Sequence, residues 1–149
     1  MSGIEAMTHG EVRSAARLAF ARDACGNPGA TMEAASEDAS ARSYWRVRGE
    51  RGTAIVMDAP AGSGDLGVWL DVDARLRAVG LNAPQVMAED RAQGFLLLSD
   101  LGTRSYLSEL DASSADALYA DALDALLAIQ TRADPHGLPR FDEPFITRE

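Results

Sequence analysis

Bulky apolar residues follow one another without interruption at one place in the chain, residues 95–98, between Gly94 and a Ser-Asp-Leu-Gly sequence at 99–102. Four such residues in succession are typical of a β-strand covered on both faces. Ser, Asp and Gly are turn and cap formers, so the strand is expected to end there. Strand-like segments precede this run, and only helical segments follow it from Arg104 onward. We therefore expect a seam between two lobes at 99–102, where backbone groups without sheet partners are available to a ligand.

Hydrophobic periodicity along the rest of the chain predicts five strands in all, with one helix inserted after the third. Residues at helical spacing, such as Val12 and Phe20, Trp69 and Val72, and Leu126 and Ile129, are expected to face a core. Strands are predicted at 31–35, 43–48, 53–57, 85–88 and 95–98, and helices at 9–24, 65–79 and 104–110 and from a cap at 113–114 to about 132.

The last residues carry helix-opening signals, with Asp142 as N-cap and Pro144 in the first turn. The sequence stops five residues after Pro144, in the middle of the helix that these signals predict. This abrupt end is the pattern expected of a piece of a longer protein.

Composition narrows the classes of partner. A net charge of −9 and a pI near 4.6 argue against nucleic acid and against an anionic membrane surface. The N-terminus lacks the basic and then apolar pattern of a signal peptide, and no apolar run in the sequence is long enough to span a membrane. The expected location is therefore the cytoplasm. The lone Cys25 excludes an internal disulfide, and no Cys/His cluster suggests zinc. All fourteen cations are Arg, so an anion bound by this chain must be held by Arg, backbone amides or a metal.

A glycine motif, Gly62-Ser-Gly-Asp-Leu-Gly67, matches the G-x-G-x-x-G dinucleotide fingerprint and is followed about twenty residues later by Glu89. Four residues starting with Asp58 separate this motif from the preceding strand, whereas the fingerprint requires its first Gly almost directly after the strand. The favoured interpretation is a flexible loop before a helix.

Three acidic positions have simple structural interpretations. Asp100-Leu-Gly is similar to the metal-binding Asp-Phe-Gly of kinases, but no His-x-Asp precedes it, so a turn closing the buried strand is favoured. Asp71 and Asp73 are two residues apart on a helix and point to different faces, so they do not form an acid/base pair.

Small residues and cations share the segment 36–46. The Ser36 and Ser40 hydroxyls and the charges of Arg42 and Arg46 are suited to an anion, because small residues let the backbone approach it. The alternative for such a segment is an ordinary entry into a β-hairpin.

Four sequence blocks occur in a fixed order: SEDASARSYWRV at 36–47, IVMDAP at 55–60, GLNAP at 80–84 and GFLLLSDLG at 94–102. Together they resemble the N-terminal part of the aminoglycoside-phosphotransferase and choline-kinase-like family. The resemblance is strongest to the anomeric N-acetylmuramate/N-acetylglucosamine kinases. It implies an α+β fold like a protein-kinase N-lobe at 1–102, with a five-stranded antiparallel sheet, one inserted helix and an N-terminal helix. Residues 103–149 would begin a truncated helical C-lobe.

The resemblance also implies a nucleotide site for ATP. Ser36, Ser40 and Arg42 would belong to the loop that covers the phosphates. The Ser99 carbonyl and the Leu101 amide, on either side of Asp100, would form hydrogen bonds with the edge of the adenine ring. Met57 would lie where related kinases have a phosphate-binding Lys, and Asp71 or Asp73 would lie at the acidic helix position. The nucleotide site that the resemblance implies therefore comprises Ser36, Ser40, Arg42, Met57, Ser99, Asp100 and Leu101.

No catalytic base or metal ligand of the family is expected before Glu149, since these groups, including those for Mg²⁺, belong to the missing C-lobe. The whole protein is expected to phosphorylate the anomeric hydroxyl of an amino sugar in cell-wall recycling, and this chain alone is expected to be inactive. The alternatives are another alcohol acceptor, a nucleotide-binding or pseudokinase module, and an α+β interaction domain.

Overall fold

Two compact units make up the chain, and the computed structural model describes its residues 8–36, 41–50 and 52–140. The first unit contains Met1–Asp73 and Ala83–Arg104, and the second contains Ala74–Asn82 and Ser105–Glu149. Ser40 and the helix expected to open at Asp142 lie outside the described residues. No helix among the described residues is long and apolar enough to cross a membrane.

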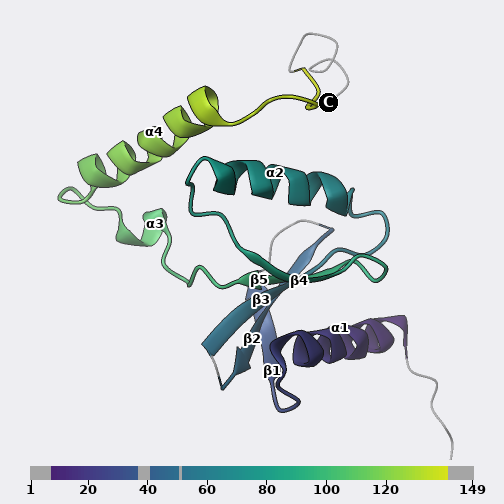
Figure 1. Ribbon diagram of the computed structural model, residues 1–149. Helices are drawn as coiled ribbons and strands as arrows, with labels where there is room; N and C mark the ends of the chain where they lie inside the picture. Colours follow the sequence, from purple (N-terminus) through teal and green to yellow (C-terminus); the bar gives the residue numbers. More distant parts are fainter. Residues whose placement is uncertain (1–7, 37–40, 51, 141–149) are drawn as a thin grey trace, which may run out of the picture. The chain divides into compact units, whose positions relative to one another are not determined.

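The first unit is built on a five-stranded sheet in the order β1-β2-β3-β5-β4 (Figure 1). Every neighbouring pair of strands is antiparallel. The strands are β1 (Thr31–Ser36), β2 (Ser43–Gly49), β3 (Gly52–Asp58), β4 (Val86–Asp90) and β5 (Phe95–Ser99). The expected α+β fold, with its antiparallel sheet and a helix inserted after the third strand, is confirmed. The parallel sheet that a dinucleotide fingerprint at Gly62 requires is absent from the described residues.

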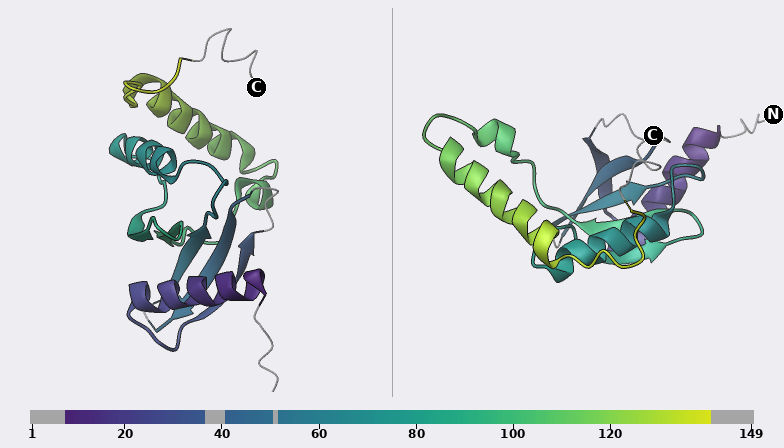
Figure 2. Two further views of the ribbon diagram at one scale, coloured as in Figure 1. Left: turned by 90° about the vertical axis from the view of Figure 1, so that its right-hand side faces the viewer. Right: turned by 90° about the horizontal axis from the view of Figure 1, so that it is seen from above.

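Helices precede, interrupt and follow the strands along the sequence. They are α1 (His9–Cys25), α2 (Leu66–Ala78), α3 (Tyr106–Glu109) and α4 (Ala115–Arg132). Helix α1 crosses one face of the sheet (Figure 2), and it is closed at its start by a capping box between Thr8 and Glu11 and at its end by Gly26 in the left-handed conformation.

Strand β5 is buried on both faces, as its apolar run predicts, because the two sides of the sheet have separate apolar clusters. Leu97 packs on the α1 side with Ala21, Val47 and Val56. Leu96 and Leu98 pack on the opposite side with Met57, and Trp69 from the first turns of α2 packs against them. Phe95 stacks on Phe20 of α1 with ring centroids 5.6 Å apart.

A buried carboxylate holds α1 on the sheet. Asp58, at the end of β3, accepts hydrogen bonds from Arg13 at 2.6 Å and from Arg17 at 2.7 Å. Arg13 also lies over the Phe95 ring and Arg17 over the Trp45 ring, at 4.4 and 3.7 Å from the ring centroids. The prediction that Val12 faces the core is wrong, since 52% of this residue is exposed and Arg17 is buried instead. Arg17 is buried because its charge is paired with Asp58 and its planar group stacks on an indole.

Helix α4 lies in the second unit. The prediction that Leu126 and Ile129 face a core is wrong for the structure described, because 48% and 40% of these residues are exposed. The buried residue of this helix is Ala128. The described part of this unit offers only the end of α2, the short α3 and connecting segments, which supply little surface to cover an apolar stripe.

Gly94 brings two of the sequence blocks together. Its backbone has a φ of +76°, and a Cβ built on it would lie 2.1 Å from the Ala59 carbonyl oxygen. The Ala59 amide donates to the Gly94 carbonyl at 2.8 Å. A side chain at position 94 would therefore separate the end of β3 from the start of β5.

We predict that Gly94→Ala lowers the free energy of unfolding by roughly 3 kcal/mol, through backbone strain and the clash with Ala59. Gly62→Ala is the matched control. Gly62 has a similar φ of +89° but no atom within 4 Å of the added Cβ, so only the conformational cost of roughly 1–2 kcal/mol applies. Urea denaturation followed by the fluorescence of Trp45 and Trp69 measures both. Equal losses in the two variants would contradict the close approach.

We predict that Asp58→Ala costs about 3–5 kcal/mol, because it leaves the buried guanidinium of Arg17 without its carboxylate. Glu33→Ala is the control, since it removes an ion pair with Arg48 in which both side chains are more than half exposed, worth at most about 1 kcal/mol. The same denaturation assay applies. A loss for Asp58→Ala no larger than that for Glu33→Ala would show that the cluster does not hold α1.

Candidate functional site

A cavity of about 310 Å³ lies in the first unit, along the sheet face opposite α1. A volume of this size is at the lower end of the range for small-molecule sites. Its walls combine apolar side chains with the backbone of the seam. The lining residues are Ala35, Tyr44, Arg46, Ile55, Trp69, Pro84, Leu98, Ser99, Asp100, Leu101 and Gly102.

Strand register determines which side chains reach this cavity. Arg46 of β2 is paired with Ile55 of β3, and Ile55 is paired with Leu98 of β5. Paired residues in antiparallel strands point to the same face, and residues two apart along a strand do so as well. Tyr44, two residues before Arg46, therefore lies on the cavity side too. The result is a continuous wall drawn from neighbouring strands.

The seam begins where β5 ends. Ser99 is held by Gln85, because the Ser99 amide donates to the Gln85 carbonyl and the Gln85 amide donates to the Ser99 hydroxyl, both at 2.8 Å. The chain then turns, with the Gly102 amide donating to Asp100 Oδ1 at 2.9 Å. Between these fixed points, the Leu101 amide has no hydrogen-bond acceptor within residues 8–36, 41–50 and 52–140. The expected turn at Asp100-Leu-Gly is thus observed, and it leaves one backbone donor beside the cavity.

An ion pair joins the turn to the sheet. Arg46 Nε donates to Asp100 Oδ2 at 2.7 Å and Arg46 Nη2 donates to Asp100 Oδ1 at 3.1 Å. The two side chains are only 13% and 6% exposed. The hydrogen bond from Arg46 is the main reason that the pKa of the Asp100 carboxyl lies well below its usual range. The same bond raises the pKa of Arg46, so the pair is fully charged at neutral pH.

The structure brings three of the seven predicted site residues together. Ser99, Asp100 and Leu101 all line the cavity. Met57 does not line it, because its side chain is fully buried in the apolar cluster beside Leu96 and Trp69.

The other predicted residues belong to the segment that precedes β2. The end of the Arg42 side chain lies against Gly64, where a Cβ would be 3.1 Å from Arg42 Nη2. Ser36 is the last residue of β1, and Ser40 lies outside the described residues.

Several cavity residues were missed by sequence reasoning. Ala35, Tyr44, Ile55 and Trp69 were assigned only to strands or to a helix face, and Arg46 was counted only as a charge in the loop. The period-2 alternation of β2 and β3 was a usable signal, because it places Tyr44 and Arg46 on one face.

The glycine motif at 62–67 has a local structural explanation. The carboxylate of Asp65 accepts a hydrogen bond from the Gly67 amide at 2.7 Å. Asp65 therefore places a carboxylate on an amide at the start of α2, where a dinucleotide would place its pyrophosphate. Together with the antiparallel sheet, this supports the interpretation of the motif as a loop before a helix.

The two acidic residues of α2 point to different faces, as their spacing predicts. Asp73 is buried, and Asp71 is exposed. Within the part of the chain that is described, no group of three His, Cys, Asp or Glu side chains is placed to hold a metal ion.

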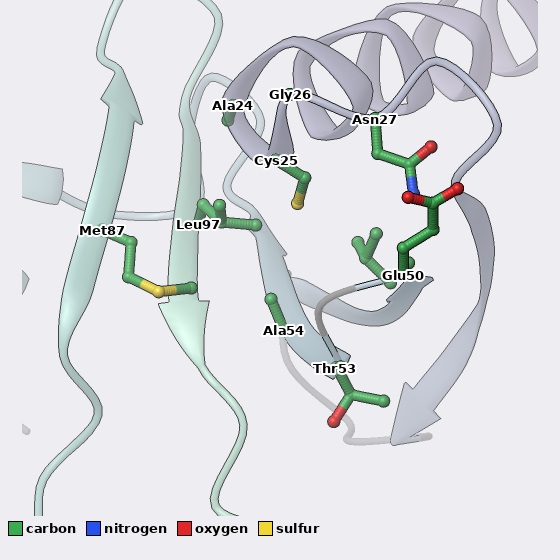
Figure 3. Close-up of a pocket in the computed structure, with 12 residues that line it drawn as sticks. Ala24, Cys25, Gly26, Asn27, Glu50, Thr53, Ala54, Met87 and Leu97 are labelled. Carbon is green, nitrogen blue, oxygen red and sulfur yellow. The ribbon is translucent and has the colours of Figure 1, made fainter.

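A second cavity, of about 280 Å³, lies on the other face of the sheet, beside the end of α1. Cys25, Leu97, Ala54 and Met87 contribute apolar surface to it, and Glu50 lies at its edge near Asn27 (Figure 3). Burial raises the pKa of the Cys25 thiol, so Cys25 is not an activated nucleophile. This cavity has no backbone seam comparable to residues 99–102.

We predict that the Asp100 carboxyl titrates below its ordinary value of 3.8. A depressed carboxyl pKa stabilises the fold above about pH 4, and this contribution is lost as the pH falls through the pKa of the folded state. Carbon-13 shifts of the carboxyl group give the titration directly. Arg46→Ala should return the pKa toward 3.8, whereas Arg48→Ala, two residues away on the same strand, should not. An Asp100 pKa at or above 3.8 in the unsubstituted chain would contradict the paired geometry.

Comparison with known proteins identifies the family. Residues 31–149 match the model of the phosphotransferase enzyme family. A protein from Pseudomonas aeruginosa named N-acetylmuramate/N-acetylglucosamine kinase is 43% identical over 123 residues, covering 82% of this chain and 36% of that protein. A protein of the same name from Pseudomonas putida is 39% identical over 122 residues, with the same coverage. One from Neisseria meningitidis is 32% identical over 120 residues, or 77% of this chain and 35% of that protein.

The chain thus spans about a third of the length of these three curated relatives. The family match covers all five strands and the cavity along β2, β3 and β5. The resemblance inferred from the four sequence blocks is confirmed, and the chain belongs to the phosphotransferase enzyme family.

Proposed function

We propose that this chain forms the nucleotide-binding lobe of an ATP-dependent sugar kinase. The observation that carries the proposal is the Leu101 amide, which has no acceptor among the described residues and lies beside the cavity at the end of β5. A planar base needs apolar walls and a few directed polar groups at its edge. Ile55, Leu98 and Ala35 supply apolar surface here. The Leu101 amide would donate to an adenine ring nitrogen, and the Ser99 carbonyl would accept from the exocyclic amine.

The phosphates would extend from the base toward the segment between β1 and β2. In related kinases a Lys on β3 holds the phosphates, but the residue at this position is Met57, which is buried in the core. We therefore assign the phosphate contacts to Arg42, with the Ser36 and Ser40 hydroxyls as further donors. An Arg fork is well suited to phosphate oxygens.

Magnesium would neutralise charge on the phosphates when it is bound. Its ligands are expected in the helical lobe of the parent protein, because the described residues gather no set of three ligands. The same lobe would supply the catalytic base. The part played by the present chain is to bind and orient the nucleotide.

The acceptor is proposed from the relatives, which are named N-acetylmuramate/N-acetylglucosamine kinases. The parent protein would transfer the γ-phosphoryl group of ATP to the anomeric hydroxyl of such an amino sugar. We place this reaction in the cytoplasm, where ATP is available. Because the catalytic base is expected in that helical lobe, we propose that the chain alone binds nucleotide without turnover.

One observation favours a second candidate, a nucleotide-binding module that does not catalyse transfer even in the parent protein. Met57 replaces the Lys of related kinases, and the whole chain lacks Lys. A single-turnover assay on the parent protein with ATP and N-acetylglucosamine separates the two candidates, since only the kinase forms a sugar phosphate.

We predict that Leu101→Pro weakens the binding of MgATP to this chain about tenfold, the equivalent of one hydrogen bond, because proline has no N–H. Isothermal titration calorimetry measures the dissociation constant. Leu101→Ala is the matched control, since it keeps the amide and removes a side chain that is already 52% exposed. Binding that Leu101→Pro leaves unchanged would place adenine elsewhere.

A further inference from the structure

The Asp100 carboxylate connects strand β2 to the turn that follows β5. It accepts two hydrogen bonds from Arg46 of β2. It also accepts the amide of Gly102 from its own turn. A short turn after a strand does not need the two bonds from Arg46 to close, so these bonds require an explanation.

The bonds fix the backbone on both sides of Leu101. The bond from the Gly102 amide to Asp100 Oδ1, at 2.9 Å, closes a turn of the kind in which an Asp side chain replaces a backbone acceptor. Leu101 is the residue enclosed by that turn. Arg46 Nη2 also donates to the Gly102 carbonyl at 3.3 Å, so one guanidinium holds Asp100 and Gly102 together.

Arg46 is itself well fixed. Arg46 lies opposite Ile55 of β3, and Ile55 lies opposite Leu98 of β5. All three residues line the cavity. The guanidinium and carboxylate are 13% and 6% exposed, and a two-pronged Arg–carboxylate contact restrains orientation as well as distance. The turn is therefore tied to the same strands that form the cavity wall.

We propose that Arg46 and Asp100 form a positioning pair that aims the Leu101 amide at the edge of a bound purine and so sets the preference of the site for adenine. The proposal rests on the nucleotide-binding function above. Neither side chain needs to touch the base. The pair holds the Leu101 amide and the Ser99 carbonyl at the spacing that suits adenine, which presents an acceptor at N1 and a donor at its amino group. Guanine presents a donor at N1 and an acceptor at O6, so the same two backbone groups do not match it.

An ion pair on the same strand provides a matched comparison. Arg48 contacts Glu33 on β1, with both side chains more than half exposed, and neither residue lines the cavity. Removing this pair tests the loss of a β2 arginine and of an ion pair without any change at the turn.

The experiment measures the dissociation constants of MgATP and MgGTP for the unsubstituted chain and its variants by isothermal titration calorimetry. We expect Arg46→Ala and Asp100→Ala to weaken ATP about tenfold and to change GTP less than threefold. Arg48→Ala should leave both constants unchanged. Arg46→Lys, which keeps the charge but loses the fork, should fall between Arg46→Ala and the unsubstituted chain.

A second readout follows the turn around Leu101, by the hydrogen exchange of the Gly102 amide in the absence of nucleotide. This amide donates to Asp100, so its exchange should be faster in Asp100→Ala than in Asp100→Asn, which keeps an oxygen to accept it, while exchange in β5 stays the same. A variant that is unfolded would show loss of protection throughout β5, and Asp100→Asn and Arg46→Lys then provide the comparison.

The outcomes separate the two proposals. Equal weakening of ATP and GTP, or an ATP-to-GTP ratio unchanged in Arg46→Ala and Asp100→Ala, would overturn the positioning role and leave nucleotide binding intact. Failure of the unsubstituted chain to bind either nucleotide would overturn the proposed function and the inference that rests on it.

Discussion

Burial of β5 on both faces is the constraint on which the first unit depends. Its residues alternate between two apolar clusters, with Leu97 in the cluster on the α1 side and Leu96 and Leu98 in the cluster on the other side. A strand in this position needs a partner on each edge, and β3 and β4 supply them. The hydrogen-bonding pattern must stop where β5 stops. The backbone that follows is left at the edge of an apolar cavity, with the Leu101 amide as a free donor within the described chain.

Two buried carboxylates pair with arginine side chains beside this sheet, in a chain that is acidic and contains no Lys. Asp58 lies at the end of β3 and binds Arg13 and Arg17 on the α1 side. Asp100 lies just beyond β5 and binds Arg46 on the side of the cavity. Both use the planar guanidinium, which pairs with a carboxylate and also stacks on aromatic rings. The first contact fixes a helix on the sheet, and the second fixes a turn beside the cavity. The same chemistry therefore serves the fold at one place and, as we propose, ligand recognition at the other.

The sequence predicted the order of strands and helices well because local signals dominate there. Thr8 and Glu11 mark the start of α1, glycines surround the β2–β3 hairpin, and an unbroken apolar run marks β5. Prediction failed where burial depends on distant partners. Arg17 is buried and Val12 is exposed because of Asp58, 41 residues away from Arg17, and no local periodicity contains that information. Tyr44 and Arg46 were missed as cavity residues for a related reason, since their positions follow from strand register.

Nucleotide is proposed to bind at residues 99–102, on the cavity face of the sheet. Amide chemical-shift mapping of the isotope-labelled chain during a titration with MgATP tests it most directly. The largest changes are expected at Leu101 and Gly102 and at Ile55 and Leu98 in the cavity wall. Changes concentrated instead at Cys25, Asn27 and Met87, around the cavity on the opposite face, would contradict the claim.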